Sequence, residues 1–471
     1  MTKDVIFTSA LDLSAQLATG RLSATDLMRA TLDRIDQVNG QVNAIVSLRE
    51  RDALMSDAQL ADQSPRRGWL HGIPIAIKEL AHARGLSATR CSPLYKNEIA
   101  VGDDLFVARI RAAGAIIIGK TNAPAFGLGS HTSNPVFGAT RNPYNTNRSS
   151  GGSSGGAAAA LATGMLSVAD GSDMMGSLRN PAGWNNVYGM RPTWGRVPDP
   201  ADADVFFNTF ATDGPMARTP GDLAALLDTM SGSDPRVPGA RIADPTLPGI
   251  DCLGGNPRVG WLGNWDGALP MAPGVLETCE AALGEMQQMG WTVENLSAPF
   301  SADRIWDSWT RLRAWTVAMR YQNDYEDAAR RQQLNPQMLF EIESGLGQTG
   351  RDIHAASLAR SDWFRSAIQL FDHFDVLALP TAQVWPFDVD LDWPRAIGGT
   401  QMDTYHRWMQ VVVPASLIGL PAISVPAGFG ADGLPMGLQL IGRPDSDAHL
   451  LQIAQSWHLE TDWPGRRPAM V

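Results

Sequence analysis

The chain has 471 residues, 44% of them hydrophobic and 18% charged, and a formal net charge of −11. The length predicts two or three subdomains, and the acidic balance argues against nucleic acid or an anionic membrane as a partner. The three cysteines, Cys91, Cys252 and Cys279, lie far apart and lack CxxC spacing. This pattern argues against a disulfide framework or a zinc site, and it favours a reducing cytoplasm.

The apolar segments do not predict a membrane anchor. The first sixteen residues, MTKDVIFTSALDLSAQ, lack the apolar core of a signal peptide. Two uncharged runs, 149–169 and 411–431, approach the length of a membrane-spanning helix. The first opens with serines and glycines, and Pro414, Pro421 and Pro426 interrupt the second. We therefore expect a cytoplasmic protein that has no membrane partner.

The N-terminal segment, residues 1–65, is predicted to be helical and to pack on the core. The stretch SATD at 23–26 is typical of a capping box at the start of a helix. The apolar residues that follow at helical spacing are Leu27, Met28, Leu32, Ile35 and Val38. Asn39-Gly40 is expected to end this helix.

Segment 66–230 alternates between predicted helices and strands. The strands are expected at 73–77, 115–120 and 166–169, and the helices at 104–113 and 157–163. A turn is expected over 171–177, where glycine and serine are frequent. This alternation predicts an α/β fold, in which helices cover a large mixed sheet on both faces.

The rest of the chain divides into two further regions. Residues 231–370 are predicted to form long helices that shape the substrate pocket. Trp306, Trp309 and Trp315 in this region suggest either an apolar or aromatic substrate or a helix core. Strand signals return at 375–380 and 421–428, so residues 371–471 are expected to complete the core sheet.

Two motifs match known patterns by letter but lack the required context. Residues 114–121, GAIIIGKT, match a phosphate loop, but the predicted order is helix, glycine and strand rather than strand, glycine and helix. Lys120 is therefore interpreted as a structural residue. Residues 151–155, GGSSG, match a nucleophile elbow, but no strand precedes them. His406 and His449 are the candidate partners of that elbow, with solvated or core histidines as the alternative.

The same serine-rich run also fits a pair of serine hydroxyls activated by a lysine. A serine hydroxyl becomes a good nucleophile only when a nearby base takes its proton, and an uncharged lysine can be that base. Because lysine titrates near 10.4 in water, it must be desolvated to be neutral at pH 7. Lys78 ends an apolar strand, which suits that role, while an exposed lysine at a strand end is the alternative. Ser153 and Ser177 are the candidate hydroxyls.

Six stretches together resemble the amidase signature family. They are HGIPIAIKEL, GAIIIGKTNAPAFG, FGATRNPYN, SSGGSSGGAAAALATG, GSDMMGSLRNPAGWNNVYGMRPTWGRVP, and LPAISVPAG with GLPMGLQLIGRP. The resemblance runs from about residue 8 to 468. It implies a triad of Ser177 as acylated nucleophile, Ser153 as bridging serine after a cis peptide bond, and Lys78 as base. It also implies that the run at 149–156 is a catalytic loop, whereas its composition alone suggests a flexible linker.

The resemblance also implies an oxyanion hole in the turn before the nucleophile. Its donors would be the backbone N–H groups of Met174, Met175, Gly176 and Ser177. The family usually has glycine where this chain has Met175, so the two methionines are expected to narrow the pocket without removing the donors. The supporting residues are expected to be Ser154 and Ser172, through hydrogen bonds, and Asp173 and Arg179, as an ion pair holding the loop or as substrate contacts.

The expected function is hydrolysis of a small-molecule carboxylic amide through an acyl-enzyme on Ser177, without a metal or an organic cofactor. Esters and carbamates share the same carbonyl geometry, so activity on them is expected as well. A homodimer is compatible with the sequence. The alternatives are a glutaminase subunit of a tRNA-dependent amidotransferase and a binding protein that has lost catalysis. The presence of Lys78, Ser153 and Ser177 together argues against the binding protein.

Overall fold

An eight-stranded mixed sheet forms the centre of the molecule in the computed structural model, which describes residues 5–200 and 204–470. The strand order is β10-β9-β11-β15-β14-β7-β8-β6. The strands are β6 (Val168–Asp173), β7 (Tyr188–Arg191), β8 (Thr212–Ala217), β9 (Arg258–Trp261), β10 (Thr292–Asn295), β11 (Val376–Pro380), β14 (Ala422–Phe429) and β15 (Pro435–Ile441). Strand β9 runs parallel to β10 and β11, and the other neighbours are antiparallel.

The strand that carries Lys78 belongs to a separate three-stranded sheet with the order β1-β3-β2. Its members are β1 (Ile45–Val46), β2 (Pro74–Lys78) and β3 (Ile116–Thr121), and Lys78 is in register with Thr121. The Lys78 backbone N–H donates to the Asp170 carboxylate of β6 at 3.1 Å. The Asp170 side chain therefore joins β2 to β6 of the large sheet, although no strand pairing joins the two sheets. Two small hairpins are β4 (Arg141–Asn142) with β5 (Asn145–Ser149) and β12 (Ala396–Ile397) with β13 (Thr400–Gln401).

Helices cover both faces of the large sheet. A Cβ on Gly189 of β7 would lie 2.9 Å from Ala182 Cβ, so this residue faces α7 (Arg179–Trp184). The neighbouring Tyr188 ring contacts His458 of α15 (Asp447–Thr461), with the ring centroids 5.6 Å apart. Successive strand residues point to opposite faces, so α7 and α15 lie on opposite sides, as predicted. The other helices of the core are α5 (Leu105–Ala112), α6 (Gly155–Ala162), α8 (Pro220–Met230), α9 (Val275–Gln288) and α14 (Val413–Leu417).

The N-terminal helices are α2 (Ala10–Ala18), α3 (Ala24–Val42) and α4 (Arg51–Gln63). The Ser23 side chain caps α3 by accepting the Asp26 backbone N–H at 3.0 Å, as the capping pattern predicts. The predicted end at Asn39-Gly40 is wrong, because α3 continues to Val42 and ends where Asn43 takes the left-handed conformation. A single exposed glycine costs a helix only about 1 kcal/mol, so Gly40 does not stop it.

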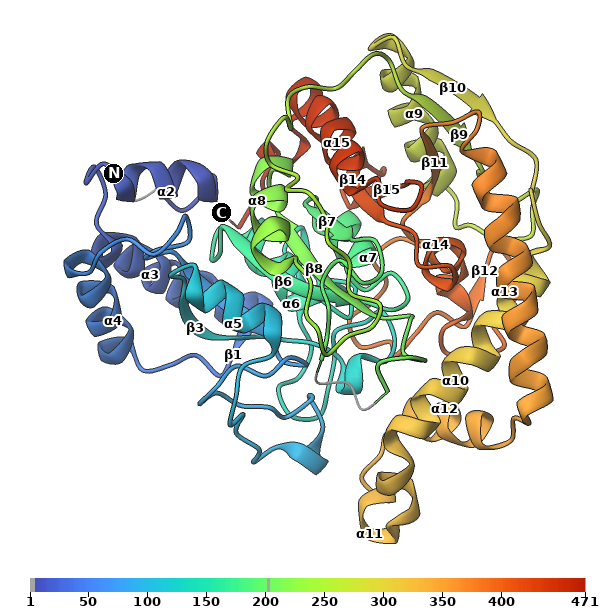
Figure 1. Cartoon of the computed structure of the whole chain (residues 1–471), viewed down its shortest axis with the longest axis horizontal. Helices are drawn as coiled ribbons and strands as arrows, with labels where there is room; N and C mark the ends of the chain where they lie inside the picture. The colour runs from blue at the N-terminus through green and yellow to red at the C-terminus, as the bar shows by residue number, and fades with distance from the viewer. Residues whose placement is uncertain (1–4, 201–203, 471) are drawn as a thin grey trace.

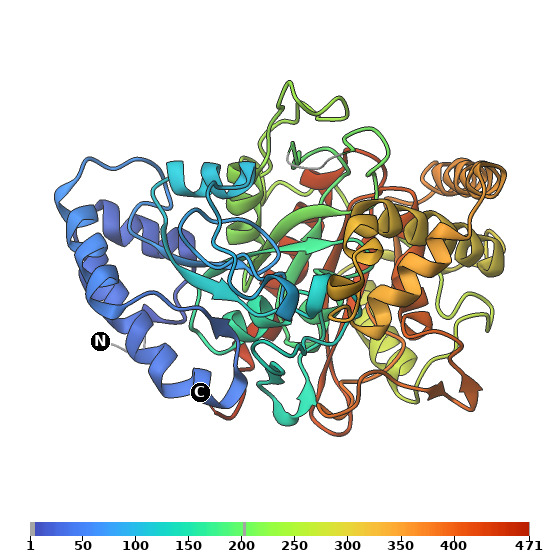
Figure 2. The ribbon, with the colours of Figure 1, turned by 90° about the horizontal axis from the view of Figure 1, so that it is seen from below.

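A second group of helices lies at the opposite end of the molecule from α2 to α4, with the large sheet between them (Figures 1 and 2). It consists of α10 (Ala302–Glu326), α11 (Ala328–Arg331), α12 (Pro336–Leu346) and α13 (Gly350–Leu370). The region 231–370 is not purely helical, because it also supplies β9 and β10 to the sheet. No helix within the described ranges is long and apolar enough to cross a membrane.

Candidate active site

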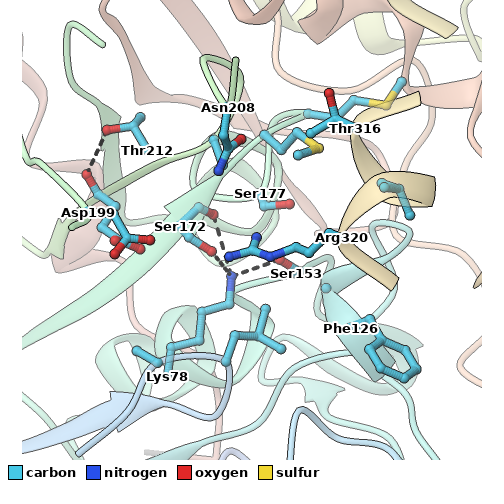
Figure 3. A pocket seen from close by; sticks show the side chains of 18 of the residues that line it. Lys78, Phe126, Ser153, Ser172, Ser177, Asp199, Asn208, Thr212, Thr316 and Arg320 are labelled. Atoms are coloured by element: carbon cyan, nitrogen blue, oxygen red, sulfur yellow. Dashed lines mark hydrogen bonds between the residues drawn. The ribbon is translucent and has the colours of Figure 1, made fainter. Parts of the chain in front are cut away.

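Lys78 is buried at the end of β2, and its amine faces three serine hydroxyls. Figure 3 shows the amine beside two of them, Ser153 and Ser172. Its Nζ lies 2.7 Å from Ser153 Oγ, 2.8 Å from Ser154 Oγ and 3.0 Å from Ser172 Oγ. The side chain is 1% exposed, so the alternative of an exposed lysine at a strand end is wrong. Segments that are 75 to 94 residues apart in the sequence therefore meet at a single amine.

The surroundings of Lys78 favour its neutral form. Burial lowers the pKa of Lys78 to about 8, although the negative charges of Asp170, Asp213 and Asp173 partly oppose this shift. The three groups that accept hydrogen bonds from Nζ through their side chains are uncharged, so none of them strongly stabilises an ammonium ion. With a pKa of about 8, about a tenth of the amine is neutral at pH 7. This lysine can therefore accept a proton near neutral pH.

The loop that carries Ser153 is ordered and buried from residue 149 to 156. Thr132 holds it from behind by donating its backbone N–H to the Gly151 carbonyl at 3.0 Å. A Cβ on Gly155 would lie only 2.4 Å from Thr132 Oγ1, so glycine permits this close approach. The Gly152–Ser153 peptide bond is cis. This run is therefore a packed loop, and its interpretation as a flexible linker is wrong.

The turn before Ser177 is shorter than predicted. Strand β6 continues to Asp173 because residues 168–173 pair with 212–217 of β8, so the turn occupies only residues 174–177. Gly176 lies in the left-handed region with φ of 78°. Its backbone N–H donates to Asp173 Oδ1 at 2.8 Å, so this group is not free to bind a substrate oxygen. The expected set of four oxyanion donors is thereby reduced to three.

The three remaining candidates are the backbone N–H groups of Met174, Met175 and Ser177, which make no hydrogen bond to another described residue. The Ser177 hydroxyl likewise bonds to no residue within the described ranges, and it lines the same cavity as Lys78 and Ser153. The Ser154 backbone N–H donates to the Ser177 carbonyl at 3.1 Å, which places the two serine loops side by side. The turn therefore presents a hydroxyl and unpaired N–H groups in one place.

Asp173 and Arg179 form a fully buried ion pair at the base of the turn. Two guanidinium nitrogens of Arg179 lie 3.0 Å from the two carboxylate oxygens of Asp173. Burial alone would raise the pKa of Asp173, but the positive charges of Arg179 and Arg191 outweigh it and lower the pKa well below its usual range. Arg179 also donates to Gln439 Oε1 at 2.6 Å and to Ser416 Oγ at 2.7 Å. These contacts support the loop-holding role rather than a role in substrate binding.

A cavity of about 430 Å³ opens above these residues. One face of α10 lines it with side chains at helical spacing, namely Arg313, Thr316, Val317, Arg320 and Tyr321. Aromatic surface comes from Phe126, Trp194 and Tyr321. Trp306, Trp309 and Trp315 do not line this cavity, so the suggestion that they form the pocket is wrong. Trp306 and Trp309 are buried in the core instead. No cluster of metal-ligating side chains occurs among residues 5–200 and 204–470.

Comparison with known proteins now identifies the family. The family model described as Amidase matches residues 26–451. The chain belongs to the amidase family. It is 32% identical to an acylamidase of Rhodococcus erythropolis, a match that covers 98% of this chain and 97% of that protein. It is 34% identical to a subunit of the glutamyl-tRNA(Gln) amidotransferase of Ralstonia pickettii, with 97% and 98% covered.

Solved structures of amidase family members share the whole fold. A bacterial aryl acylamidase matches with a TM-score of 0.91 and 26% identity, covering 98% of this chain and 99% of that one. A 6-aminohexanoate cyclic dimer hydrolase matches with a TM-score of 0.86 and 26% identity, covering 99% of each chain. The predicted amidase signature fold is confirmed, and the protein is an amide-hydrolysing enzyme.

Sequence reasoning missed two groups of residues around the site. Asp170, which accepts the Lys78 backbone N–H, was not singled out. The α10 face was also missed, although its polar and apolar residues recur at i, i+3, i+4, i+7 and i+8 from Arg313. That periodicity was available in the sequence, but nothing in it indicated that the face would turn toward Ser177.

Proposed function

We propose that the protein hydrolyses carboxylic amides through an acyl-enzyme on Ser177. The Ser177 oxygen attacks the amide carbonyl carbon while its proton passes to Ser153, whose own proton passes to neutral Lys78. The C–N bond then breaks, and the departing nitrogen receives a proton from Lys78 by way of Ser153. Water next attacks the acyl ester by the same proton route, which releases the acid and restores Ser177.

The observation that carries this proposal is the contact between a desolvated lysine and a serine hydroxyl beside the proposed nucleophile. Lys78 Nζ lies 2.7 Å from Ser153 Oγ, and burial lowers the pKa of Lys78 to about 8. A base with a pKa close to the working pH combines a useful neutral fraction with sufficient basicity. Ser177 borders the same cavity.

The turn supports the stabilisation of the tetrahedral intermediate. We expect the N–H groups of Met174, Met175 and Ser177 to donate to the oxygen that gains charge when Ser177 attacks. Removal of one such donor typically lowers kcat about 10²–10³-fold. The Gly176 N–H is assigned a different task, because it holds the turn on Asp173.

The cavity lining supports a small amide with an apolar or aromatic group. Phe126 and Tyr321 form an edge-to-face pair with the ring centroids 5.2 Å apart, and both rings border the cavity. Leu128 and Val317 add apolar surface beside them. The similarity to an acylamidase and to an aryl acylamidase points in the same direction. Activity on esters and carbamates with similar substituents is expected as well.

A hydrolysis screen of the purified chain tests the proposal. Anilides, aliphatic amides, peptide amides and carbamates are offered without ATP or partner proteins, and the release of acid and amine is measured. We expect turnover of anilides, covalent labelling by a fluorophosphonate probe, and loss of both in the Ser177→Ala variant. Full activity or full labelling of Ser177→Ala would show that the nucleophile is wrong.

A glutaminase subunit of an amidotransferase is the second candidate, favoured by the 34% identity to one component of such an enzyme over nearly the whole chain. The two candidates differ in their substrates and in their need for partners. A glutaminase subunit is expected to release ammonia from glutamine and to depend on its partner proteins. Hydrolysis of anilides by the isolated chain, with glutamine turned over poorly, would exclude it.

A further inference from the structure

The proposed oxyanion turn, residues 174–177, is held at its base by Asp173 at the end of β6. Asp173 accepts the Gly176 N–H at 2.8 Å and the Leu178 N–H at 3.2 Å, and it is paired with Arg179. A Cβ on Gly176 would lie 2.8 Å from Val412 Cγ2, so the backbone packs closely there as well. These contacts hold both ends of the turn, but none of them reaches Met175, which lies between them.

Met175 is held by a different part of the chain. Its side chain is 3% exposed, and its Sδ lies 3.5 Å from Arg313 Nη1 on α10. Within the described residues, Nη1 donates its hydrogen bond to this sulfur. The contact crosses from the turn to α10 over 138 positions of the sequence. It joins the helical region directly to a residue whose backbone N–H is a proposed oxyanion donor.

Arg313 is itself fixed in place, which makes it a rigid support. Its Nε donates to Glu341 Oε1 of α12 at 2.8 Å, and its Nη2 donates to the Tyr405 hydroxyl at 2.7 Å. The Tyr405 hydroxyl in turn donates to Glu341 Oε1 at 2.6 Å. Arg313 is 3% exposed and Glu341 is 1% exposed, so water does not compete for these bonds.

We propose that Arg313 is a positioning residue, which fixes the backbone N–H of Met175 in the oxyanion hole by holding the Met175 side chain. The inference rests on the proposed function of the turn and adds a residue from α10 to the parts that set its geometry. An oxyanion donor acts only if it lies within hydrogen-bond distance of the developing negative charge, so loosening Met175 weakens transition-state binding more than substrate binding.

The test is a mutant cycle between Met175 and the buried Arg313–Glu341 pair, which is replaced as one unit. Met175→Leu keeps the volume and removes the sulfur acceptor. Arg313→Met combined with Glu341→Gln removes the buried ion pair as a unit, so no unpaired carboxylate is left. Both changes are then combined in a third variant. The readouts are kcat and KM for an amide that the wild-type enzyme hydrolyses, and the rate at which a fluorophosphonate labels Ser177.

We expect each change to lower kcat and the labelling rate about tenfold, with KM within about twofold, since displacement of a donor by a fraction of an ångström costs that much. The combined variant should also lose about tenfold, because both arms of the cycle break the Arg313–Met175 contact, through which Arg313 acts on the turn. Met175→Gln supplies an amide oxygen that accepts the hydrogen bond from Arg313. It should therefore keep most of the activity that Met175→Leu loses, but only when Arg313 is present. Met338→Leu, at a buried methionine of α12 that does not line the cavity, is the matched control and should leave kcat unchanged.

Two outcomes would overturn this inference and leave the proposed function intact. If the losses multiply in the combined variant, the two side chains act independently. If KM rises while kcat is constant, Arg313 binds substrate and does not position the turn. Thermal unfolding of each variant separates both outcomes from misfolding. Full activity of Ser177→Ala would instead overturn the proposed function, and this inference with it.

Discussion

Two buried ionisable side chains, Lys78 and Asp173, lie beside the turn that carries Ser177. They differ in the groups that surround them. On one side, Lys78 is surrounded by the hydroxyls of Ser153, Ser154 and Ser172. On the other, Asp173 is paired with Arg179 and Arg191. The lysine is 1% exposed and the aspartate is 0% exposed, so burial is the same on both sides.

The difference shows that the partners, and not burial, decide what a buried charge can do. Hydroxyl partners let burial lower the pKa of Lys78 to about 8, where the group changes protonation near neutral pH. Arginine partners outweigh burial and lower the pKa of Asp173, so its carboxylate stays charged at neutral pH. The first cluster can therefore transfer protons, whereas the second can only hold structure.

Removal of the titratable amine should have the largest effect. Lys78→Ala should lower kcat about 10³–10⁴-fold, because Ser177 loses its proposed base. The matched control is Lys120→Met, at an equally buried lysine of β3 whose Nζ donates to the Ala81 carbonyl. This variant should keep kcat within a few-fold if circular dichroism shows it to be folded. Equal losses in two folded variants would end the distinction between a catalytic and a structural lysine.

Breaking the paired cluster should act on stability. Asp173→Asn leaves two buried guanidinium groups without their carboxylate and should lower the free energy of unfolding by about 3–5 kcal/mol, measured by urea denaturation. Lys78→Met should have the opposite sign, since it removes a buried amine that is costly to charge. A stabilising Asp173→Asn, or a strongly destabilising Lys78→Met, would contradict the contrast between the clusters.

The pH dependence of activity and of stability should also distinguish Lys78 from Asp173. In the proposed mechanism neutral Lys78 is the active form, so kcat/KM should fall about tenfold per pH unit below a pKa of about 8 and level off above it. The folded pKa of Lys78 lies below its unfolded value of 10.5, so its contribution to stability should grow as the pH rises through about 8. The contribution of Asp173 is present above its unfolded pKa of 3.8 and is lost only in strong acid. A profile that is flat between pH 6 and about 9 would contradict the assignment of the base.

The smallest effects are expected from the two supporting hydroxyls. Ser154→Ala and Ser172→Ala each remove one acceptor from Lys78 Nζ and should lower kcat only a few-fold. Because these acceptors stabilise the ammonium form, their loss should shift the inflection of the pH profile to lower pH. Ser56→Ala, at an exposed serine of α4, serves as the control. A shift to higher pH would show that the hydroxyls favour the neutral amine.

Local patterns in the sequence predicted the parts of the fold that local physics determines. The apolar run at 73–77 and the cap at Ser23 were predicted correctly, since both depend on neighbouring residues. The end of β6 was not, because its last residues pair with β8, which lies some forty residues further along the chain. Likewise, no local pattern predicts the contact between Arg313, Glu341 and Tyr405, because these side chains come from three separate segments.

The order of strands in the large sheet also affects how the enzyme can mature. Strands β14 and β15 lie between β7 and β11, and Arg179, beside the turn that carries Ser177, bonds to Gln439 of β15. Because ribosomes release a chain from its amino end, Lys78, Ser153 and Ser177 emerge well before these central strands. The nascent chain therefore carries all three groups before the active site is complete. Until residue 441 has left the exit tunnel, β7 and β11 each leave one strand edge unpaired, and such edges are prone to aggregation and are bound by chaperones.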